Sequence, residues 1–435
     1  MISDEEDLEE FLQVNSETAY IRLQWIDFSG VLRTRFLPAA RCLQIARGYE
    51  DYHVPQVSMI TPISTAPRCF PTGNDVETWV LRPDWSSLRI CGFRQTHASA
   101  MCFLQRKGVM DPYGMCPRTV VYSAIKGLER QWGTLVMGGF EIEVMLLDPD
   151  FQPLNQPDRL SSYQTTAGLR GETLQIIEDI VDNLKDSSID VHHFHTETQN
   201  QIEIALRPEP LLDAIDSLVL AQETIRTVFI QRNIKAAMAP KPLLKGPTNG
   251  IHMHLSLDTT LAQPYADHFL AGTLSHVPSL CAFGMANFDG YVRTTKDAAG
   301  EWIGFGTENR DLPVRKVNNH HWEFRMMDGT SNPYLFAAAV LLAGSDGLSE
   351  RAELTWKDCR GFPHSLDEAG RAEYQLERMP NSLHEALESL KVDSVLRTWM
   401  PKSLMRSYIS LKEKEVEVFK TMPDDERRLR FLEYF

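Results

Sequence analysis

The chain has 435 residues, of which 43% are hydrophobic and 24% are charged. This composition is ordinary for a soluble globular protein and excludes a disordered, collagen-like or small disulfide-stapled chain. The 44 Lys and Arg residues against 59 Asp and Glu residues give a net charge of −15. An acidic surface argues against general binding to nucleic acid or an anionic membrane, since either needs a basic footprint. The length predicts two or three domains, or one large domain beside a small one.

The cysteine pattern and the N-terminal residues predict the compartment. Seven cysteines are scattered without a CxxC pair, which is typical of reduced cysteines in a cytosolic protein. The first ten residues are acidic and lack the apolar core of a secretory signal. The longest uncharged apolar stretch, residues 333–344, has about half the length needed to span a bilayer. We therefore expect a soluble cytoplasmic protein with neither a membrane nor a nucleic-acid partner.

The first part of the chain is predicted to be rich in strands. Residues 20–37 form two alternating runs around residues 27–30, which predict a hairpin. Residues 50–116 hold many prolines and short runs, which favour loops with occasional strands. We place a domain boundary near residue 115, so that the predicted domains are 1–115 and 116–435.

The second part alternates strands and helices. Apolar residues at helical spacing predict helices over 172–185 and 213–232. The Ser-Asn-Pro segment at 331–333 can cap a third helix, which Gly344 would end. Interleaved Lys and Glu predict helical structure from residue 403 onward.

Four apolar segments carry polar residues at alternate positions, and such residues share one face of a strand. The sets are Glu141 with Glu143, Gln201 with Glu203, His252 with His254 and Ser256, and Glu323 with Arg325. One interpretation is four antiparallel strands with a wet face, which is common. The apolar flanks favour buried strands instead, where uncompensated charges are costly and bound cations would relieve their repulsion. Glutamate oxygens with one imidazole suit Mg²⁺ or Mn²⁺ better than zinc or copper.

A second group is basic, because Arg293, Arg310, Arg315 and Arg325 fall within 33 residues. Arginine is favoured where planar carboxylates or phosphates are held, although surface salt bridging in an acidic protein is an equal alternative. The sequence contains no P-loop, no GxGxxG after a strand and no GxSxG nucleophile motif. A metal-dependent hydrolase is a competing interpretation, but it needs no ATP and gives Arg310 and Arg315 no role.

Six segments, in order over nearly the whole chain, resemble the motifs of glutamine synthetases and related amine ligases. They are Asp27 to Gly30; Gly139-x-Glu141-x-Glu143; His195-Thr-Glu197 with Gln201-x-Glu203; Met238-Ala-Pro-Lys241-Pro242 with Gly250-x-His252-x-His254-x-Ser256; Asn309-Arg310 to Arg315; and Glu323-x-Arg325 with Asp328 and Asn332-Pro333-Tyr334. The resemblance implies an α+β fold. A small N-terminal β-grasp domain, 1–115, would precede a catalytic domain, 116–435, whose curved antiparallel sheet is flanked by helices and forms a funnel.

The resemblance also implies a set of site residues. Two or three Mg²⁺ or Mn²⁺ ions would lie at the waist of the funnel, with ATP as co-substrate entering one end and the acid the other. One ion would be held by Glu143, Glu197 and Glu203, and another by Glu141, His252 and Glu323. Arg293 would hold the carboxylate of a glutamate-like acid, with Tyr163 over the acid pocket and with Asn249 and Gly250 in the loop before His252. Arg310, Arg315 and Arg325 would surround the transferred phosphoryl group. His254 and Ser256 would lie near the nucleotide. Members assemble as homo-oligomeric double rings whose active sites are shared between neighbours.

The sequence departs from the family pattern mainly on the substrate side. The segment from Glu197 to Glu203 is one residue shorter than usual, which makes Glu197 the least secure ligand. The loops before His252 and after Arg293 are altered, and His321 stands where many members carry arginine. No glutamate occupies the position that binds ammonium in ammonia-using members; Glu301 is nearby but displaced.

We therefore expect retained ATP chemistry with a changed amine or acid. The predicted function is an ATP-dependent carboxylate–amine ligase that activates the γ-carboxylate of glutamate, or a similar acid, as an acyl phosphate and joins it to an organic amine. The alternatives are a true glutamine synthetase that uses ammonia, a ligase for another acid and amine, and a non-catalytic structural or regulatory member of the family.

Overall fold

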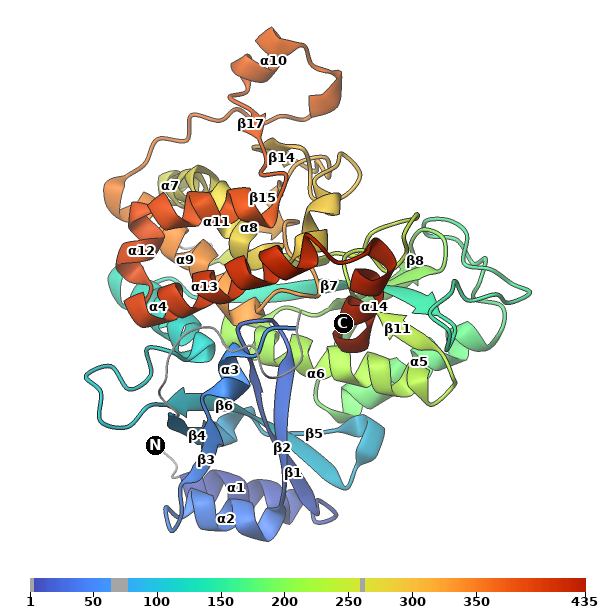
Figure 1. Ribbon diagram of the computed structural model, residues 1–435, viewed down its shortest axis with the longest axis vertical. Coiled ribbons are helices and arrows are strands. Elements are labelled where there is room, and N and C mark those ends of the chain that lie inside the picture. Colours follow the sequence, from blue (N-terminus) through green and yellow to red (C-terminus); the bar gives the residue numbers. More distant parts are fainter. Residues whose placement is uncertain (1–3, 64–76, 259–262) are drawn as a thin grey trace.

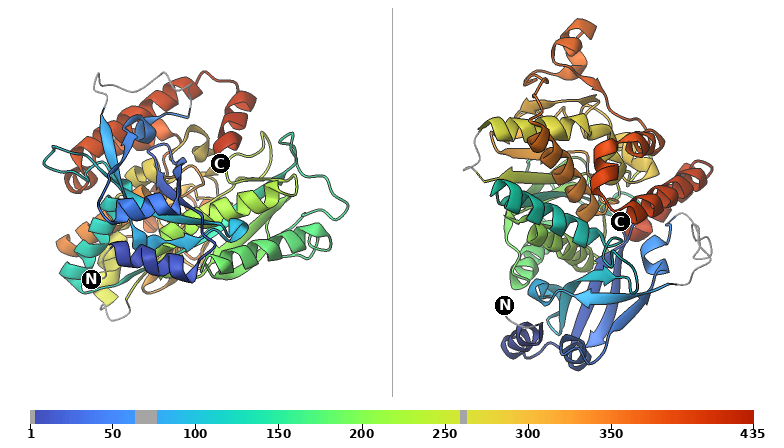
Figure 2. Two further views of the ribbon diagram at one scale, coloured as in Figure 1. Left: turned by 90° about the horizontal axis from the view of Figure 1, so that it is seen from below. Right: turned by 90° about the vertical axis from the view of Figure 1, so that its left-hand side faces the viewer.

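The computed structural model describes residues 4–63, 77–258 and 263–435, and two β-sheets organise them (Figure 1). A six-stranded sheet belongs to the N-terminal part and a nine-stranded sheet to the remainder. Figure 2 shows the N-terminal residues, in blue, at one end of the molecule and the segment around α10 (Glu368–Glu373), in orange, at the other. None of the described helices is both long and apolar enough to cross a membrane. The six cysteines among these residues are unpaired and buried, whereas Cys69 lies outside them.

The N-terminal sheet is built around the predicted hairpin, which is confirmed. The strands β1 (Tyr20–Ile26) and β2 (Leu32–Pro38) pair antiparallel, and β1 pairs in parallel with β6 (His97–Gln105) on its other side. The remaining elements are β3 (Tyr52–Pro55), β4 (Thr78–Pro83), β5 (Arg89–Ile90), α1 (Asp4–Val14), α2 (Ala39–Ala46) and α3 (Val57–Ile60). This curled mixed sheet, with α1 and α2 across one end (Figure 1), is the small N-terminal domain that the resemblance implied.

The large sheet has the strand order β14-β15-β16-β12-β7-β9-β8, with β10 and β11 also pairing with β7. All four segments with alternating polar residues form strands, as the sequence predicted. The structure shows that these strands are antiparallel neighbours in the middle of the sheet. The bounds are β7 (Val136–Leu147), β8 (Val191–Thr196), β9 (Gln201–Leu206), β10 (Glu209–Pro210), β11 (Lys235–Ala237), β12 (Ile251–Leu257), β14 (Phe305–Thr307), β15 (Val314–Asn318) and β16 (His321–Phe324). A separate pair joins β13 (Trp302–Ile303) to β17 (Glu377–Arg378).

Helices flank the large sheet, and α6 packs directly on β7. The predicted helices are confirmed as α5 (Glu172–Asp186), α6 (Leu211–Ile230), α9 (Pro333–Glu350), α13 (Lys402–Phe419) and α14 (Asp424–Tyr434). The others are α4 (Pro117–Trp132), α7 (Gln263–Ser275), α8 (Val277–Gly284), α11 (Leu383–Val392) and α12 (Ser394–Trp399). The predicted end of α9 at Gly344 is wrong. A Cβ at Gly344 would lie 2.2 Å from the Phe269 ring, so this glycine permits close packing of α9 on α7 instead of ending the helix.

The β1–β2 turn fits against the start of α9. The Asp27 carboxylate accepts hydrogen bonds from the backbone N–H groups of Ser29 and Val31, both at 2.9 Å. Gly30 has φ +84°, and a Cβ there would lie 2.2 Å from the Thr330 carbonyl oxygen. The Asn332 side chain, the N-cap of α9, donates to the Asp27 carbonyl at 3.0 Å. The turn therefore needs glycine both for its backbone conformation and for its close approach to the second domain.

A buried ionic network forms a second connection between the two parts. The Arg118 guanidinium on α4 is 3% exposed and lies 2.7 Å from carboxylate oxygens of both Asp216 and Asp84. The Tyr334 hydroxyl on α9 donates to Asp216 at 2.6 Å. Because Asp84 follows β4 of the N-terminal sheet, these four side chains fix that sheet relative to α4, α6 and α9.

We expect the stability contributed by Asp27 to fall as the pH rises. Burial raises the pKa of Asp27 from 3.8 to about 6, although the Arg33 charge opposes the rise. Between about pH 4 and pH 6 the native state therefore binds more protons than the unfolded state, and stability declines as Asp27 ionises. Asp27→Asn does not titrate, so the advantage of the wild type over this variant should shrink by ~3 kcal/mol across that range. Urea unfolding at a series of pH values measures this, and parallel stability curves would contradict it.

Candidate active site

A cavity of about 490 Å³ opens over the middle of the large sheet. It is lined almost entirely by polar and ionisable side chains. They are Glu141, Glu143, Tyr163, Gln164, His193, His195, Glu197, Glu203, His252, His254, Lys296, Asp297, Arg310, Asp311, Arg315 and Arg325, with Val317 as the apolar exception.

Strand register brings the carboxylates together. On β7, Glu141 lies opposite His252 of β12, and Glu143 lies opposite Glu203 of β9. Alternate side chains of a strand point to opposite faces, so Ile142 and Val144 of β7 are fully buried while the two glutamates face the cavity. Cross-strand pairing thus makes one polar surface from residues far apart in the chain.

The first cluster of potential metal ligands, called here the first carboxylate group, comprises Glu141, His252 and Glu323. One ligand atom from each lies within 4.8 Å of the others. The Nδ1 atom of His252 lies 3.3 Å from an oxygen of Glu141 and 3.3 Å from one of Glu323. The structure therefore brings together all three residues expected for one ion. A set of two carboxylates and one imidazole has the oxygen-rich chemistry that Mg²⁺ or Mn²⁺ takes.

The second carboxylate group comprises Glu143 and Glu203, together with the other nitrogen of His252. This Nε2 atom is buried without a hydrogen-bond partner, 3.6 Å from Glu143, and such an orphaned polar atom suits a site that holds a cation. Glu197, expected as the third ligand, lines the same cavity but contributes no atom to the compact group. Its carboxylate lies 3.5 Å from Nδ1 of His195.

The shifted pKa values follow from this crowding. Burial, then the carboxylates of Glu203 and Glu143, raise the pKa of Glu197 to about 8. Burial also disfavours ionisation of Glu323, but the Arg325 and His252 charges outweigh it and hold the Glu323 pKa below its usual range. Burial also disfavours ionisation of Glu141, but the hydrogen bonds and charges of His252 and His254 outweigh it and lower the Glu141 pKa. A cation among these groups would relieve the repulsion at Glu197 most directly.

The four predicted arginines occupy different positions. The Nη1 atom of Arg315 donates to Glu323 at 2.8 Å, and Arg325 pairs with the other oxygen of that carboxylate. Arg310 is exposed and lines the cavity. Arg293 lies outside the cavity lining, 1% exposed, and donates to the carbonyls of Met327 and Arg325 at 2.8 and 3.0 Å. Its Nε atom has no hydrogen-bond partner.

The remaining predicted residues surround the carboxylates. Gly250 donates its backbone N–H to Glu143, and a Cβ at Gly250 would lie 2.3 Å from the Arg293 guanidinium. Asn249 is fully buried and holds the loop by donating to the Ala237 and Ala239 carbonyls.

Three predicted residues lie toward the edges of the cavity. The Tyr163 ring is 45% exposed and meets the His195 ring edge-on at 5.4 Å. His254 lies 3.1 Å from Glu141, and its Nδ1 is 2.8 Å from Nε2 of His321. Ser256 lines an adjoining hollow of about 290 Å³ that it shares with His254.

Seven cavity residues were given no site role by sequence reasoning: Gln164, His193, His195, Lys296, Asp297, Asp311 and Val317. His193 and His195 are two residues apart on β8, and this period-2 spacing could have identified them. Lys296 and Asp297 belong to the altered loop after Arg293, where no regular spacing exists. Their side chains reach the cavity only through the path of that loop.

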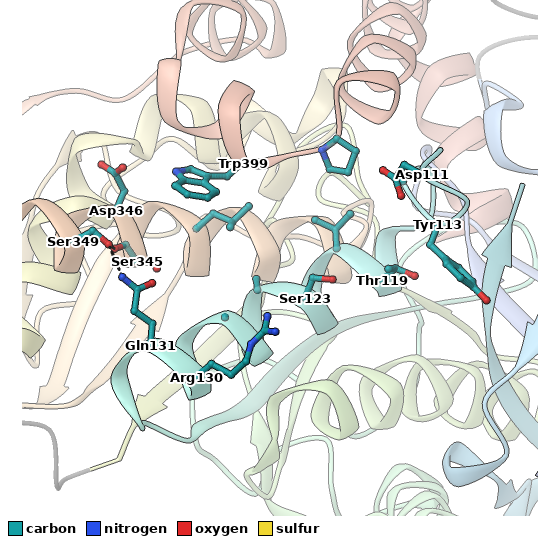
Figure 3. A pocket seen from close by; sticks show the side chains of 16 residues that line it. Asp111, Tyr113, Thr119, Ser123, Arg130, Gln131, Ser345, Asp346, Ser349 and Trp399 are labelled. Atoms are coloured by element: carbon teal, nitrogen blue, oxygen red, sulfur yellow. Dashed lines mark hydrogen bonds between the residues drawn. The ribbon is translucent and has the colours of Figure 1, made fainter. Parts of the chain in front are cut away.

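A second groove, of about 420 Å³, lies away from these carboxylates between α4 and α9 (Figure 3). Figure 3 shows Trp399 and Asp346 on one side of it and Arg130 and Gln131 on the other. None of the clusters of three potential metal ligands found among the described residues lies in this groove. The candidate active site is therefore the polar cavity over the large sheet.

Residues 114–430 match the sequence model of the family described as glutamine synthetase, catalytic domain. The match covers well over half of the chain, which therefore belongs to the glutamine synthetase family. The ligases of this family use ATP and divalent metals to join glutamate to ammonia or an amine.

Proteins with similar sequences carry the names of different activities. Protein fluG of Emericella nidulans is 29% identical over the whole chain, which spans 51% of that protein. Gamma-glutamylpolyamine synthetase GlnA3 of Streptomyces coelicolor is 25% identical, with 93% of this chain and 91% of the relative covered. The glutamine synthetase of Pyrococcus abyssi is 26% identical, with 94% of each chain covered.

Solved structures share the fold over nearly the whole chain. A GmaS/ADP complex superposes with a TM-score of 0.82 at 21% identity and covers 99% of both chains. A crystal structure described as a novel glutamine synthase homolog gives a TM-score of 0.80 at 24% identity, covering 96% of this chain and 99% of that one. The predicted two-part glutamine-synthetase-like fold is confirmed.

We expect Glu323→Gln to weaken Mn²⁺ binding at least about tenfold, because it removes one charged oxygen ligand. Glu308→Gln is the matched control, since Glu308 also pairs with Arg315 but is 57% exposed and outside both carboxylate groups. Calorimetric titration of each variant with Mn²⁺ gives the affinities. Equal affinity in Glu323→Gln and the wild type would refute the ligand assignment.

Proposed function

We propose that the protein is an ATP-dependent carboxylate–amine ligase that forms a γ-glutamyl amide, or the amide of a similar acid, from an organic amine. The observation that carries this proposal is the cavity itself, which combines two carboxylate groups suited to Mg²⁺ or Mn²⁺ with flanking arginines and an acidic pair. The metal ligands would be Glu141, His252 and Glu323 for one ion, and Glu143, Glu203 and Glu197 for another.

The chemistry requires two steps. The γ-phosphoryl group of ATP passes to a carboxylate oxygen of the acid, ADP leaves, and an acyl phosphate forms. The amine nitrogen then attacks the acyl carbon, phosphate leaves, and a carboxylate accepts the proton released from the nitrogen. Bound divalent cations supply neutralisation of the phosphates. Arg310, Arg315 and Arg325 would orient the phosphoryl group and offset its charge, since such transfer depends on positioning and electrostatics.

An acidic pair at the cavity supports the choice of an amine. Asp297 and Asp311 both line the cavity. Burial raises the pKa of Asp311, and the nearby charge of Asp297 raises it further, although the charge of His364 opposes the rise. Two neighbouring carboxylates attract a protonated amine and can take up its proton. Glu301, by contrast, lies outside the cavity lining, 3.3 Å from Arg378. The amine would therefore meet Asp297 and Asp311 in this proposal, and not Glu301, which shares the loop of Asp297 but lies outside the cavity lining.

Relatives support two candidate amines. The similarity to a gamma-glutamylpolyamine synthetase favours an organic amine, and the similarity to an archaeal glutamine synthetase keeps ammonia as the second candidate. The altered loop carrying Lys296 and Asp297 favours the organic amine. The proposal includes a division into domains 1–115 and 116–435, and a cytoplasmic homo-oligomeric double ring in which N-terminal domains complete neighbouring sites.

The decisive experiment is hydroxylamine trapping with ATP, Mg²⁺ and glutamate. Hydroxylamine is small and nucleophilic at neutral pH, so it intercepts an acyl phosphate whatever amine is native. Hydroxamate and ADP should form in equal amounts, and a panel of amines then identifies the acceptor. Absence of hydroxamate in protein that binds metal and nucleotide would exclude glutamate as the acid. Failure to bind either would leave the non-catalytic alternative.

We expect Asp297→Asn to lower kcat/KM for a protonated amine about tenfold, because one attractive charge of ~1.4 kcal/mol is lost. Hydroxylamine is uncharged at neutral pH, so hydroxamate formation should fall much less. Asp190→Asn is the matched control, since the Asp190 side chain is 66% exposed and does not line the cavity. Equal losses with both nucleophiles would show that Asp297 does not select the amine by charge.

A further inference from the structure

Two imidazoles and a carboxylate meet at the β8 side of the cavity. His193 and His195 are two residues apart on β8, with rings stacked at 5.5 Å and 18° between their planes. His195 lies opposite Glu203 in the strand register. One ligand atom from each of the three residues lies within 4.8 Å of the others. The strand pairing, and not a loop, holds this set in place.

We propose that His193, His195 and Glu203 form an additional site, sharing Glu203 with the second carboxylate group, for a borderline transition metal of the Zn²⁺ or Co²⁺ class. Imidazole nitrogens favour such ions, whereas the oxygen-rich carboxylate groups favour Mg²⁺ or Mn²⁺. The Nε2 atom of His195 lies 3.2 Å from Oε1 of Glu203. Two ligand atoms that each lie ~2.1 Å from one tetrahedral ion are about 3.4 Å apart, which is close to the distance between His195 Nε2 and Glu203 Oε1.

The surroundings leave room for such an ion. His193 is exposed and lines the cavity, so solvent can fill the remaining coordination positions. Its Nδ1 atom lies 2.7 Å from Nδ1 of His192, which leaves the Nε2 atom for a metal. His192 falls at the irregularity in β8 pairing between Val191 and His193 and is outside the ligand group.

The histidine site shares Glu203 with a neighbouring metal-ligand group, so an ion bound at one site affects binding at the other. The same carboxylate belongs to the Glu143–Glu203–His252 group. An ion at His193 and His195 therefore competes for one ligand of the adjacent magnesium-type group, or bridges to it. The chain would respond to zinc-class ions differently from a protein whose metal groups contain only carboxylates and His252.

The test is Co²⁺ titration of the full-length protein in saturating Mg²⁺, followed by visible absorption and by metal analysis after gel filtration. The wild type should retain one Co²⁺ per chain that Mg²⁺ does not displace, with a spectrum typical of nitrogen ligation. His193→Ala and His195→Ala should each weaken this binding at least about tenfold. His384→Ala is the control, because that side chain is 68% exposed on α11.

Two results would overturn the proposal: identical Co²⁺ retention in His193→Ala and the wild type, or complete displacement of Co²⁺ from the wild type by Mg²⁺. Because His193 is exposed, the variant should fold, and circular dichroism checks this. The inference does not rest on the ligase proposal. Hydroxamate formation by the wild type in Mg²⁺ alone tests the ligase, whereas Co²⁺ retention tests only the histidine site.

Discussion

Electrostatic repulsion among glutamates is the constraint around which this structure is arranged. Five glutamate side chains, Glu141, Glu143, Glu197, Glu203 and Glu323, surround one small region of the large sheet. Burial makes their shared negative charge expensive, and each is partly offset by an imidazole or guanidinium. The raised pKa of Glu197 shows where the offset is incomplete. Rigid antiparallel pairing is needed because a flexible scaffold would let such groups move apart.

The rest of the fold keeps that sheet in place. Apolar residues on the reverse of β7 pack against helices, and α6 contacts the strand directly. The N-terminal part is attached at two points with different chemistry. One is a tight glycine turn against the start of α9, and the other is the buried Arg118 network. A buried ion pair adds little net stability, but breaking it leaves an unpaired charge, so it specifies one arrangement strongly.

Regular periodicity explains what the sequence could predict. The i, i+2 pattern correctly placed Glu141, Glu143, His252 and Glu323 on shared faces because a strand alternates its side chains. The order of motifs gave the family and the two-part fold. Loop residues were missed, since Asp297 reaches the cavity through an irregular path that no period encodes. The end of α9 was mispredicted because Gly344 serves helix packing, which depends on the distant Phe269 ring. The buried position of Arg293 likewise depends on carbonyls contributed by another segment.

Glu323 lies between the potential metal ligands on one side and two arginines on the other. Its two oxygens are held by Arg315 and Arg325, while the His252 ring lies beside it. A cation bound to Glu323, as proposed above, would compete with both guanidiniums and free them to turn toward an incoming anion. Occupancy of the proposed metal position and affinity for a phosphate-bearing ligand would thereby be linked thermodynamically, and such linkage is reciprocal. Under the proposed function, metal and nucleotide would therefore each favour binding of the other through this one carboxylate on β16, whichever of them binds first.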